Sequence, residues 1–325
     1  MSATVPAALP VDDATERQLA RGEKKTERGV ANRSKRRLTS RGATIAALII
    51  AVIWTTPTFG LFISSFRPQD QIATTGWWTI FSNWGFTLDN YAAVLQSGST
   101  SLSLGQSFVN SIAITLPATA FPLVIAALAA YAFAWIDFKG KNWLFIGVFA
   151  LQIVPLQMAL VPLLSLFSRG LNVGGVQLFD SLGASGSYAQ VWIAHTIFAL
   201  PLAIFLLHNF VSEIPRELIE AARVDGAGHG QIFFRIVLPL TMPAIASFAI
   251  FQFLWVWNDL LVALVFADGA VGPVTKVLAA LPGQYGEAWH LLTAGAFISI
   301  LIPLIVFLAL QRYFVRGLLA GSTKG

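Results

Sequence analysis

Six long apolar segments constrain the fold of this chain more than any other feature of its sequence. Each is near or above the roughly 20 residues that a helix needs to cross a hydrocarbon core about 30 Å thick. Inside that core every backbone polar group must be bonded within the protein, which favours helices for segments of this length. We therefore predict an all-α, polytopic membrane protein with six transmembrane helices. Their expected bounds are 43–66, 107–135, 142–167, 189–211, 244–266 and 288–314.

The composition agrees with a membrane-embedded chain. Of the 325 residues, 56% are hydrophobic and only 11% are charged, whereas a soluble domain carries about 25% charged residues. Because cysteine is absent, a disulfide framework and a cysteine metal site are both excluded. The histidines show no spacing typical of metal ligands, so we expect no metal site. For His195 and His208, in or beside the fourth segment, we prefer a packed helix–helix hydrogen bond to a proton relay.

The positive charge is concentrated before the first span. The net charge is +5, and ten of the 21 basic residues stand in the first 41 positions. The positive-inside rule explains such a cluster by a cytoplasmic N-terminus, so we expect no nucleic-acid partner. Residues 1–42 are predicted to form a disordered basic cytoplasmic tail that lies on the lipid bilayer, and a short helix around Asp13 to Lys25 is compatible with this. Six spans then place both termini in the cytoplasm.

Aromatic residues gather in the long loop between the first two segments. Residues 67–106 carry few charges and include Trp77, Trp78 and Trp84, so we expect this loop outside the cell. An aromatic belt at the membrane interface explains the composition. A surface that meets an external binding protein is the alternative.

Two prolines interrupt the third segment. Pro155 and Pro162 are seven residues apart, which is about two helical turns, so their kinks would open on one face of a single span. A bundle that rocks during transport would use such kinks. Prolines are also more frequent in membrane helices generally, so the functional and the ordinary interpretation both stay open.

A long polar insert, Glu213 to Pro243, separates the fourth and fifth segments. Pro215 suits the first turn of a helix, which would run to about Asp225 before a glycine-rich stretch ends it. A second short helix, Gln231 to Leu238, is expected to stop at Pro239. Both helices are shorter than the roughly 12–15 residues that an isolated helix needs in water. We therefore interpret the insert as a docking element on the cytoplasmic side.

Residues of this insert resemble the EAA loop of binding-protein-dependent ABC importers. The matching residues are Glu220, Ala221, Ala222, Asp225, Gly226, Ala227, Leu238, Pro239, Leu240 and Pro243. In that family the loop is a coupling helix that sits in a cleft of the ATP-hydrolysing subunit. The resemblance implies that Glu220 positions the helix by polar contacts, that the small residues Ala221, Ala222 and Gly226 permit close approach, and that Asp225 holds the turn before Ala227. An ordinary amphipathic loop is the alternative.

Two further segments narrow the resemblance. Residues 192–210 and 251–259, together with the C-terminal ending 311–325, are similar to the MalG-type permease subunit of carbohydrate importers, and most similar to its α-glucoside or glucosylglycerol branch. In that family the C-terminal tail reaches toward the ATPase subunits. The resemblance covers residues 43–325, which we treat as one transmembrane domain with a coupling loop at 212–243. It does not cover the N-terminal tail.

The chain contains no phosphate-binding loop of the pattern G-x-x-x-x-G-K-[ST]. We therefore expect that it is not an enzyme and binds no cofactor itself. ATP and Mg would be bound by partner ATPase subunits.

Candidates for contact with the transported solute stand in the fifth segment. Trp255, Trp257, Asn258 and Asp259 combine indole, amide and carboxylate groups, which suit a sugar that is apolar on its faces and hydroxylated on its edges. If the span starts at residue 244, Asp259 lies roughly 24 Å along it, past the midplane. An inter-helix polar clamp with interfacial tryptophans is the alternative.

Together these features indicate a permease subunit of an ATP-driven sugar importer in the bacterial cytoplasmic membrane, working by alternating access. The resemblance implies four kinds of partner: a second, MalF-like permease subunit, two ATPase subunits, an extracytoplasmic sugar-binding protein and the lipid bilayer. An ABC permease for another solute, such as a peptide or amino acid, is one alternative. A gradient-driven secondary transporter is another, although the spans carry few charges and no detectable inverted repeat.

Overall fold

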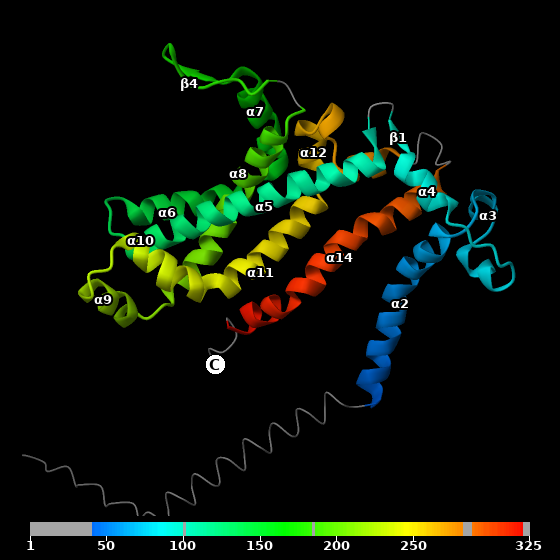
Figure 1. Cartoon of the computed structure of the whole chain (residues 1–325), viewed down its shortest axis with the longest axis horizontal. Helices are drawn as coiled ribbons and strands as arrows, with labels where there is room; N and C mark the ends of the chain where they lie inside the picture. Colours follow the sequence, from blue (N-terminus) through cyan, green and yellow to red (C-terminus); the bar gives the residue numbers. More distant parts are fainter. Residues whose placement is uncertain (1–40, 100–101, 184–185, 282–287, 321–325) are drawn as a thin grey trace, which may run out of the picture. The chain divides into compact units, whose positions relative to one another are not determined.

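The computed structural model describes residues 41–99, 102–183, 186–281 and 288–320 (Figure 1). At residues 41, 98, 99 and 312–320 it describes the backbone only. The predicted basic tail up to residue 40, with its helix around Asp13 to Lys25, lies outside the described residues. So do the last five residues of the C-terminal ending.

The chain divides into two compact units, residues 1–61 and 62–325. The described part of the first unit belongs to helix α2 (Arg41–Ser65). Large apolar side chains such as Ile45 and Trp54 are exposed on it, as expected of a helix that meets lipid. Thr55 donates its hydroxyl to the carbonyl of Ala51 at 2.7 Å, so this polar group is satisfied inside its own helix.

Four helices of the second unit are long and apolar enough to cross a membrane. They are α5 (Leu104–Trp135), α8 (Tyr188–Ser212), the continuous run of α10 and α11 (His229–Trp257), and α14 (Trp289–Ala320). With α2 they make five in the described part of the chain, and a bent helix pair makes six if it forms one span. The prediction of an all-α, polytopic membrane protein is confirmed.

The third apolar segment differs from the expected single kinked span. Helix α6 (Lys141–Ala150) and the 3₁₀ turn η2 (Leu151–Ile153) are bent by 105° from α7 (Leu156–Arg169). The break falls at Pro155, whose ring disfavours the helical conformation for the preceding residue. Val154 is accordingly extended, with ψ of 118°. Pro162, by contrast, stays inside α7.

The fifth segment corrects two expectations. The second short helix does not stop at Pro239: α10 (His229–Ile232), a π-helical turn η3 (Phe233–Val237) and α11 (Leu238–Trp257) form one 29-residue helix. The Leu238 N–H bonds to the carbonyl of Phe233, five residues back. This wider turn shifts the hydrogen-bond register just before Pro239, so the missing proline N–H does not end the helix. The helix ends instead at Trp257, before α12 (Leu261–Phe266).

The loop after α2 is organised around a buried arginine. Arg67 is 1% exposed, and its guanidinium donates to the carbonyl of Gln71 at 3.2 Å and to the hydroxyls of Thr75 and Thr79. The Asn90 amide donates to the Arg67 carbonyl at 2.8 Å. These bonds join α3 (Gln69–Thr74), η1 (Trp77–Phe81) and α4 (Asp89–Gln96). Trp78, Phe81 and Trp84 remain exposed, as both interpretations of this loop require.

The remaining elements are short. They are the hairpin β1–β2 (Gly98–Ser99, Leu102–Ser103), the hairpin β3–β4 (Leu171–Val173, Val176–Phe179), α9 (Arg216–Val224), η4 (Gly269–Val271) and α13 (Val274–Ala280). Both hairpins are antiparallel. In Figure 1, α9 lies near the end of α5, whereas β1–β2 lies at its start.

The packing of α5 against α8 forms the centre of the second unit (Figure 1). Small residues on both helices are fully buried: Ala118, Ala126, Ala130, Ala194 and Ala203. Small side chains let two membrane helices approach closely, so that van der Waals contact replaces the hydrophobic driving force that lipid removes. One hydrophobic cluster surrounds the C-terminal half of α5 and includes Ile219, Ile232 and Phe233. The insert between the fourth and fifth segments is thereby attached to the bundle.

Candidate functional site

Helix α9 is the first part of the predicted docking element. It starts after Pro215 and runs from Arg216 to Val224, close to the expected bounds. Ile219 is its one fully buried residue, at 1% exposure, while Leu218 and Val224 are exposed. The helix therefore rests on the bundle through a narrow apolar stripe. Its wider face is free among the described residues.

The end of α9 is closed by a pair of backbone hydrogen bonds. The Ala227 N–H bonds to the carbonyl of Ala222 at 2.9 Å, and the Gly226 N–H to that of Arg223 at 3.0 Å. Gly226 has a φ of +82°. This pattern is a Schellman motif, in which a residue in the left-handed conformation follows the helix. Gly226 is thus required by the geometry of the turn, and the role of Asp225 in holding the turn stays a prediction.

Two polar contacts tie the docking element to α5. The Tyr131 hydroxyl and His229 Nδ1 are 2.9 Å apart, and the Tyr131 ring packs edge-on against Phe233 at 5.5 Å. Arg223 donates to the carbonyl of Trp135 at 3.2 Å. Both ends of the turn between α9 and α10 are therefore linked to the last two turns of α5.

The predicted coupling residues fall into two groups. Glu220, Ala221, Asp225 and Gly226 are exposed, whereas Ala222 and Ala227 are half-buried against the hydrophobic cluster at this end of α5. The small side chains of Ala222 and Ala227 thus allow close packing within this chain. Glu220 and Ala221 remain available for contact with another protein, and their predicted role in docking stays a prediction.

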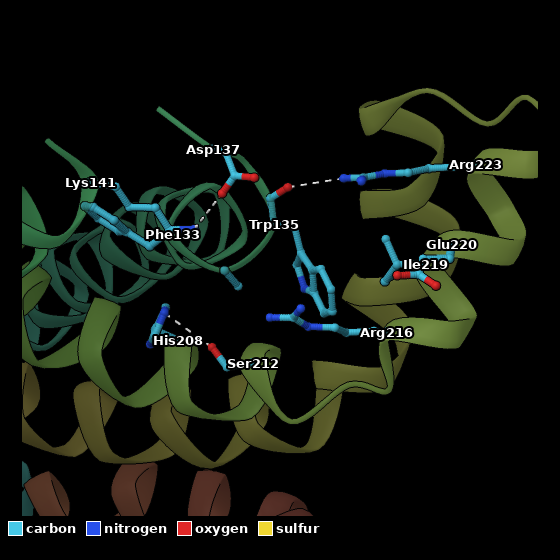
Figure 2. A pocket seen from close by; sticks show the side chains of 11 residues that line it. Phe133, Trp135, Asp137, Lys141, His208, Ser212, Arg216, Ile219, Glu220 and Arg223 are labelled. Carbon is cyan, nitrogen blue, oxygen red and sulfur yellow. Dashed lines mark hydrogen bonds and ion pairs between the residues drawn. The ribbon is translucent and has the colours of Figure 1, made fainter. Parts of the chain in front are cut away.

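A pocket of about 310 Å³ lies between α9 and the ends of α5 and α8 (Figure 2). Its walls carry Trp135, Asp137, Lys141, His208, Ser212, Arg216, Glu220 and Arg223. Sequence reasoning missed this pocket, because its residues come from four separate stretches of the chain. Lys141 pairs with Asp137 at 3.6 Å, and His208 Nε2 lies 3.2 Å from the Ser212 hydroxyl of its own helix.

Trp257, one of the predicted solute contacts, is inside the bundle. Its indole is 2% exposed, and Nε1 donates to the carbonyl of Ser299 on α14 at 3.1 Å. The ring stacks on Phe253 at 5.8 Å and meets Phe108 of α5 edge-on at 5.5 Å. These contacts are those of the alternative interpretation, a clamp between helices.

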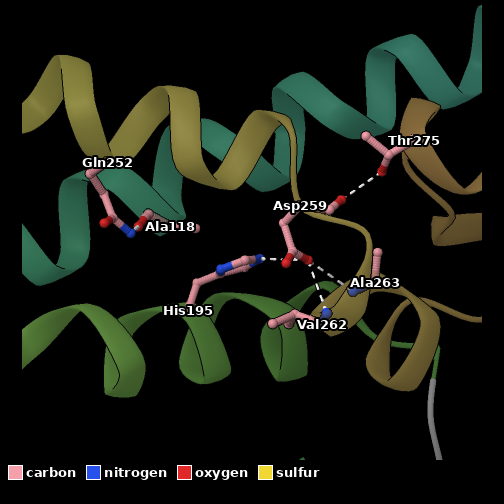
Figure 3. A network of polar contacts seen from close by, with 7 residues as sticks. All are labelled: Ala118, His195, Gln252, Asp259, Val262, Ala263 and Thr275. Carbon is pink, nitrogen blue, oxygen red and sulfur yellow. Dashed lines mark hydrogen bonds and ion pairs between the residues drawn. The ribbon is translucent and has the colours of Figure 1, made fainter. Parts of the chain in front are cut away.

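Asp259 also makes contacts between elements (Figure 3). Its Oδ2 accepts from the N–H groups of Val262 and Ala263 at 3.0 and 3.2 Å, which caps the start of α12. The same oxygen lies 3.8 Å from His195 Nε2 on α8. The carbonyl of Asp259 accepts from the Thr275 hydroxyl at 2.6 Å. The carboxylate thus joins α8 to the break after α11.

The expected depth of Asp259 needs correction. Counting from residue 244 placed it within a helix, but the helix begins at His229 and ends at Trp257. Asp259 stands after that end. The two remaining candidates are more open: Asn258 is exposed and Trp255 is 43% exposed. Trp255 also lines a small pocket with His195 and Gln252.

His195 and Gln252 are buried polar residues that were not among the predicted solute contacts. They are 4% and 3% exposed, and the Gln252 amide donates to the carbonyl of Ala118 at 3.3 Å (Figure 3). An ionisable or amide group inside an apolar segment is the signal that points to such residues. In the part of the chain that the structure describes, no group of three or more His, Asp or Glu residues is arranged to hold a metal ion.

Comparisons with known proteins extend these observations. The chain is 53% identical over 288 residues to the osmoprotective compounds uptake permease protein GgtD of Synechocystis, covering 86% of this chain and 91% of the relative. It is 39% identical to the alpha-glucoside transport system permease protein AglG of Rhizobium meliloti, covering 86% of this chain and 96% of the relative.

A solved structure shares the fold. One chain of a bacterial alginate ABC transporter, in complex with its alginate pentasaccharide-bound periplasmic protein, aligns with a TM-score of 0.58 and 16% identity. The alignment covers 84% of this chain and 94% of that one. Residues 123–319 match the model of a family described as the binding-protein-dependent transport system inner membrane component. The chain therefore belongs to this family of ABC importer permease subunits.

Proposed function

We propose that this chain forms half of the translocation pathway of an ATP-driven importer for α-glucosides or closely related osmoprotective glucosides. Two relatives support this substrate class: one is named for osmoprotective compounds and the other for alpha-glucosides. The complex lies in the bacterial cytoplasmic membrane. Both termini of the chain face the cytoplasm, as the basic N-terminal tail favours.

The observation that carries the proposal is the geometry of α9. A nine-residue helix rests on one buried isoleucine, ends in a Schellman motif and leaves Glu220 and Ala221 exposed. Such a helix is too short to be stable alone. It is suited to sit in a cleft of an ATPase subunit and to follow the movement of that subunit.

Movement of α9 reaches the spans through the contacts at the end of α5. When ATP closes the dimer of ATPase subunits, α9 is displaced. Arg223 then acts on the Trp135 carbonyl, and the turn acts on Tyr131 through His229. α5 packs along α8, so a shift of its end re-orients the central helix pair. The pathway alternates between outward and inward access.

The partners follow from this role. A second, MalF-like permease subunit completes the pathway, two ATPase subunits bind ATP and Mg, and an external sugar-binding protein delivers the solute. This chain has no catalytic part in ATP hydrolysis. Within the pathway, Trp255 and Asn258 are the candidates for solute contact because they are exposed. Trp257 and Asp259 hold the helices that carry them.

Co-purification tests the proposal. The chain is extracted in mild detergent, its bound proteins are identified, and ATPase activity is measured with binding protein loaded with different α-glucosides. We expect a second permease and an ATPase to accompany it, and loaded binding protein to raise hydrolysis. A chain that purifies alone, with no associated ATPase, would favour a gradient-driven transporter instead. Stimulation only by a peptide or amino acid would reject the sugar.

A further inference from the structure

The pocket between α9 and the spans has more hydrogen-bond donors than its neighbours use (Figure 2). Lys141, Arg216 and Arg223 supply three positive charges, and Trp135, His208 and Ser212 add polar groups. Asp137 and Glu220 supply two negative charges. The Asp137 side chain is fully exposed and pairs with Lys141 at 3.6 Å, so it lies at the rim.

Several of these donors are without a partner in the described part of the chain. The indole Nε1 of Trp135 is buried and makes no hydrogen bond there. Arg223 uses one nitrogen on the Trp135 carbonyl, and Arg216 has no ion pair with any described carboxylate. A buried donor left unsatisfied is costly. A ligand with several acceptor oxygens would provide hydrogen-bond partners for these donors.

The position of the pocket indicates the chemistry of this ligand. It lies at one end of α5 and α8, both of them membrane spans, and therefore at the level of the lipid headgroups. Basic pockets between transmembrane helices bind phosphate headgroups there. The positive-inside rule alone would place Lys and Arg in loops facing water. It does not account for a buried indole N–H in the same pocket.

We propose that this pocket binds a phosphate group, held by Arg216, Arg223 and Lys141 with the Trp135 N–H as an additional donor. An anionic lipid headgroup or a soluble phosphate compound would supply the same chemistry.

The bound group would bridge α9, through its two arginines, to the start of α6 and the end of α5. This consequence rests on the proposed coupling role of α9: occupancy would stiffen the connection between the docking helix and the spans. Binding itself does not depend on that role.

Binding is measured on the full-length chain, alone and in its assembled complex, after removal of lipid. The probes are cardiolipin, phosphatidylcholine and inorganic phosphate, and the readouts are retained mass by native mass spectrometry and the shift in thermal unfolding. Arg216→Gln and Lys141→Gln remove one charge each from the pocket. Lys139→Gln is the matched control, because Lys139 is exposed in the loop just before α6, two residues from Lys141, but does not line the pocket.

We expect cardiolipin to bind and phosphatidylcholine not to. Affinity should fall about tenfold in Arg216→Gln, the size expected for loss of one charge-assisted hydrogen bond, and stay unchanged in Lys139→Gln. If inorganic phosphate alone produces a shift that Arg216→Gln abolishes, the ligand is a soluble phosphate. The proposal is overturned if neither cardiolipin nor inorganic phosphate binds. It is also overturned if Lys139→Gln loses as much affinity as Arg216→Gln. Because none of these readouts uses transport, failure of the importer proposal would be seen separately.

Discussion

At the scale of single residues, the docking element depends most on Gly226. Its φ of +82° lies in the left-handed region, where a side chain costs about 1–2 kcal/mol. Gly226→Ala is therefore expected to loosen the end of α9 and to reduce sugar uptake relative to ATP hydrolysis. Uptake and hydrolysis are measured together in reconstituted vesicles.

Gly228→Ala is the matched control for this variant. Gly228 has a φ of −77° and open space around its Cα, so alanine fits without strain and coupling should be normal. Equal coupling in the Gly226 and Gly228 variants would mean that the turn does not transmit the movement.

Trp257 gives a second prediction at this scale. Trp257→Phe keeps an aromatic ring against Phe253 but removes the donor to the Ser299 carbonyl. A net loss of about 0.5–1.5 kcal/mol of stability is expected, with unchanged affinity for the sugar. Thermal unfolding of the assembled complex and sugar-dependent transport are the measurements. Weaker sugar affinity at unchanged stability would instead indicate that Trp257 contacts the sugar.

At the scale of elements, the start of α12 depends on Asp259. Its carboxylate caps two N–H groups, and loss of such a cap costs about 0.5–2 kcal/mol. Asp259→Ala should therefore lower the thermal stability of the complex, while Asp259→Asn, which keeps an acceptor, should lower it less. If both variants keep full stability but lose transport, the carboxylate acts on the solute.

The contact between Tyr131 and His229 links α5 to α10 and gives a second prediction at this scale. Tyr131→Phe removes the hydroxyl that bonds to His229 but keeps the ring on Phe233. We expect the complex to assemble and hydrolyse ATP with reduced uptake per ATP. A double-mutant cycle with His229→Ala separates this bond from other effects, since the two losses should not add. Fully additive losses would show that the two side chains act independently.

The sequence predicted the bounds of some helices much better than those of others. It placed the helices at 107–135 and 189–211 within three residues of α5 and α8, because long apolar runs bounded by polar residues determine them. It failed at prolines: Pro155 breaks its segment, whereas Pro239 does not. The difference lies in the π-helical turn before Pro239, a hydrogen-bond register that has no signature in the residue types. The partners of Trp257 and Asp259 come from distant helices and required the tertiary structure.

At the scale of the whole molecule, the path of the third apolar segment determines how many times the chain crosses the membrane. The 105° bend at Pro155 is compatible with a broken span or with a segment that re-enters the same side. These two paths place the β3–β4 hairpin on opposite sides of the membrane. Since the chain has no cysteine, single cysteines can be introduced without changing any other residue.

We predict that the segment crosses. Asn172→Cys in the hairpin should react with a membrane-impermeant maleimide in intact cells, and Lys139→Cys, in the loop before α6, should react only after the membrane is opened. Both positions are exposed, so reactivity reports the side of the membrane and not burial. Asn83→Cys, in the loop between α2 and α5 and also exposed, serves as the positive control, because that loop precedes the bend and lies outside in both topologies. If Asn172→Cys and Lys139→Cys label under the same condition, the segment is re-entrant, and the chain has five crossings with its termini on opposite sides.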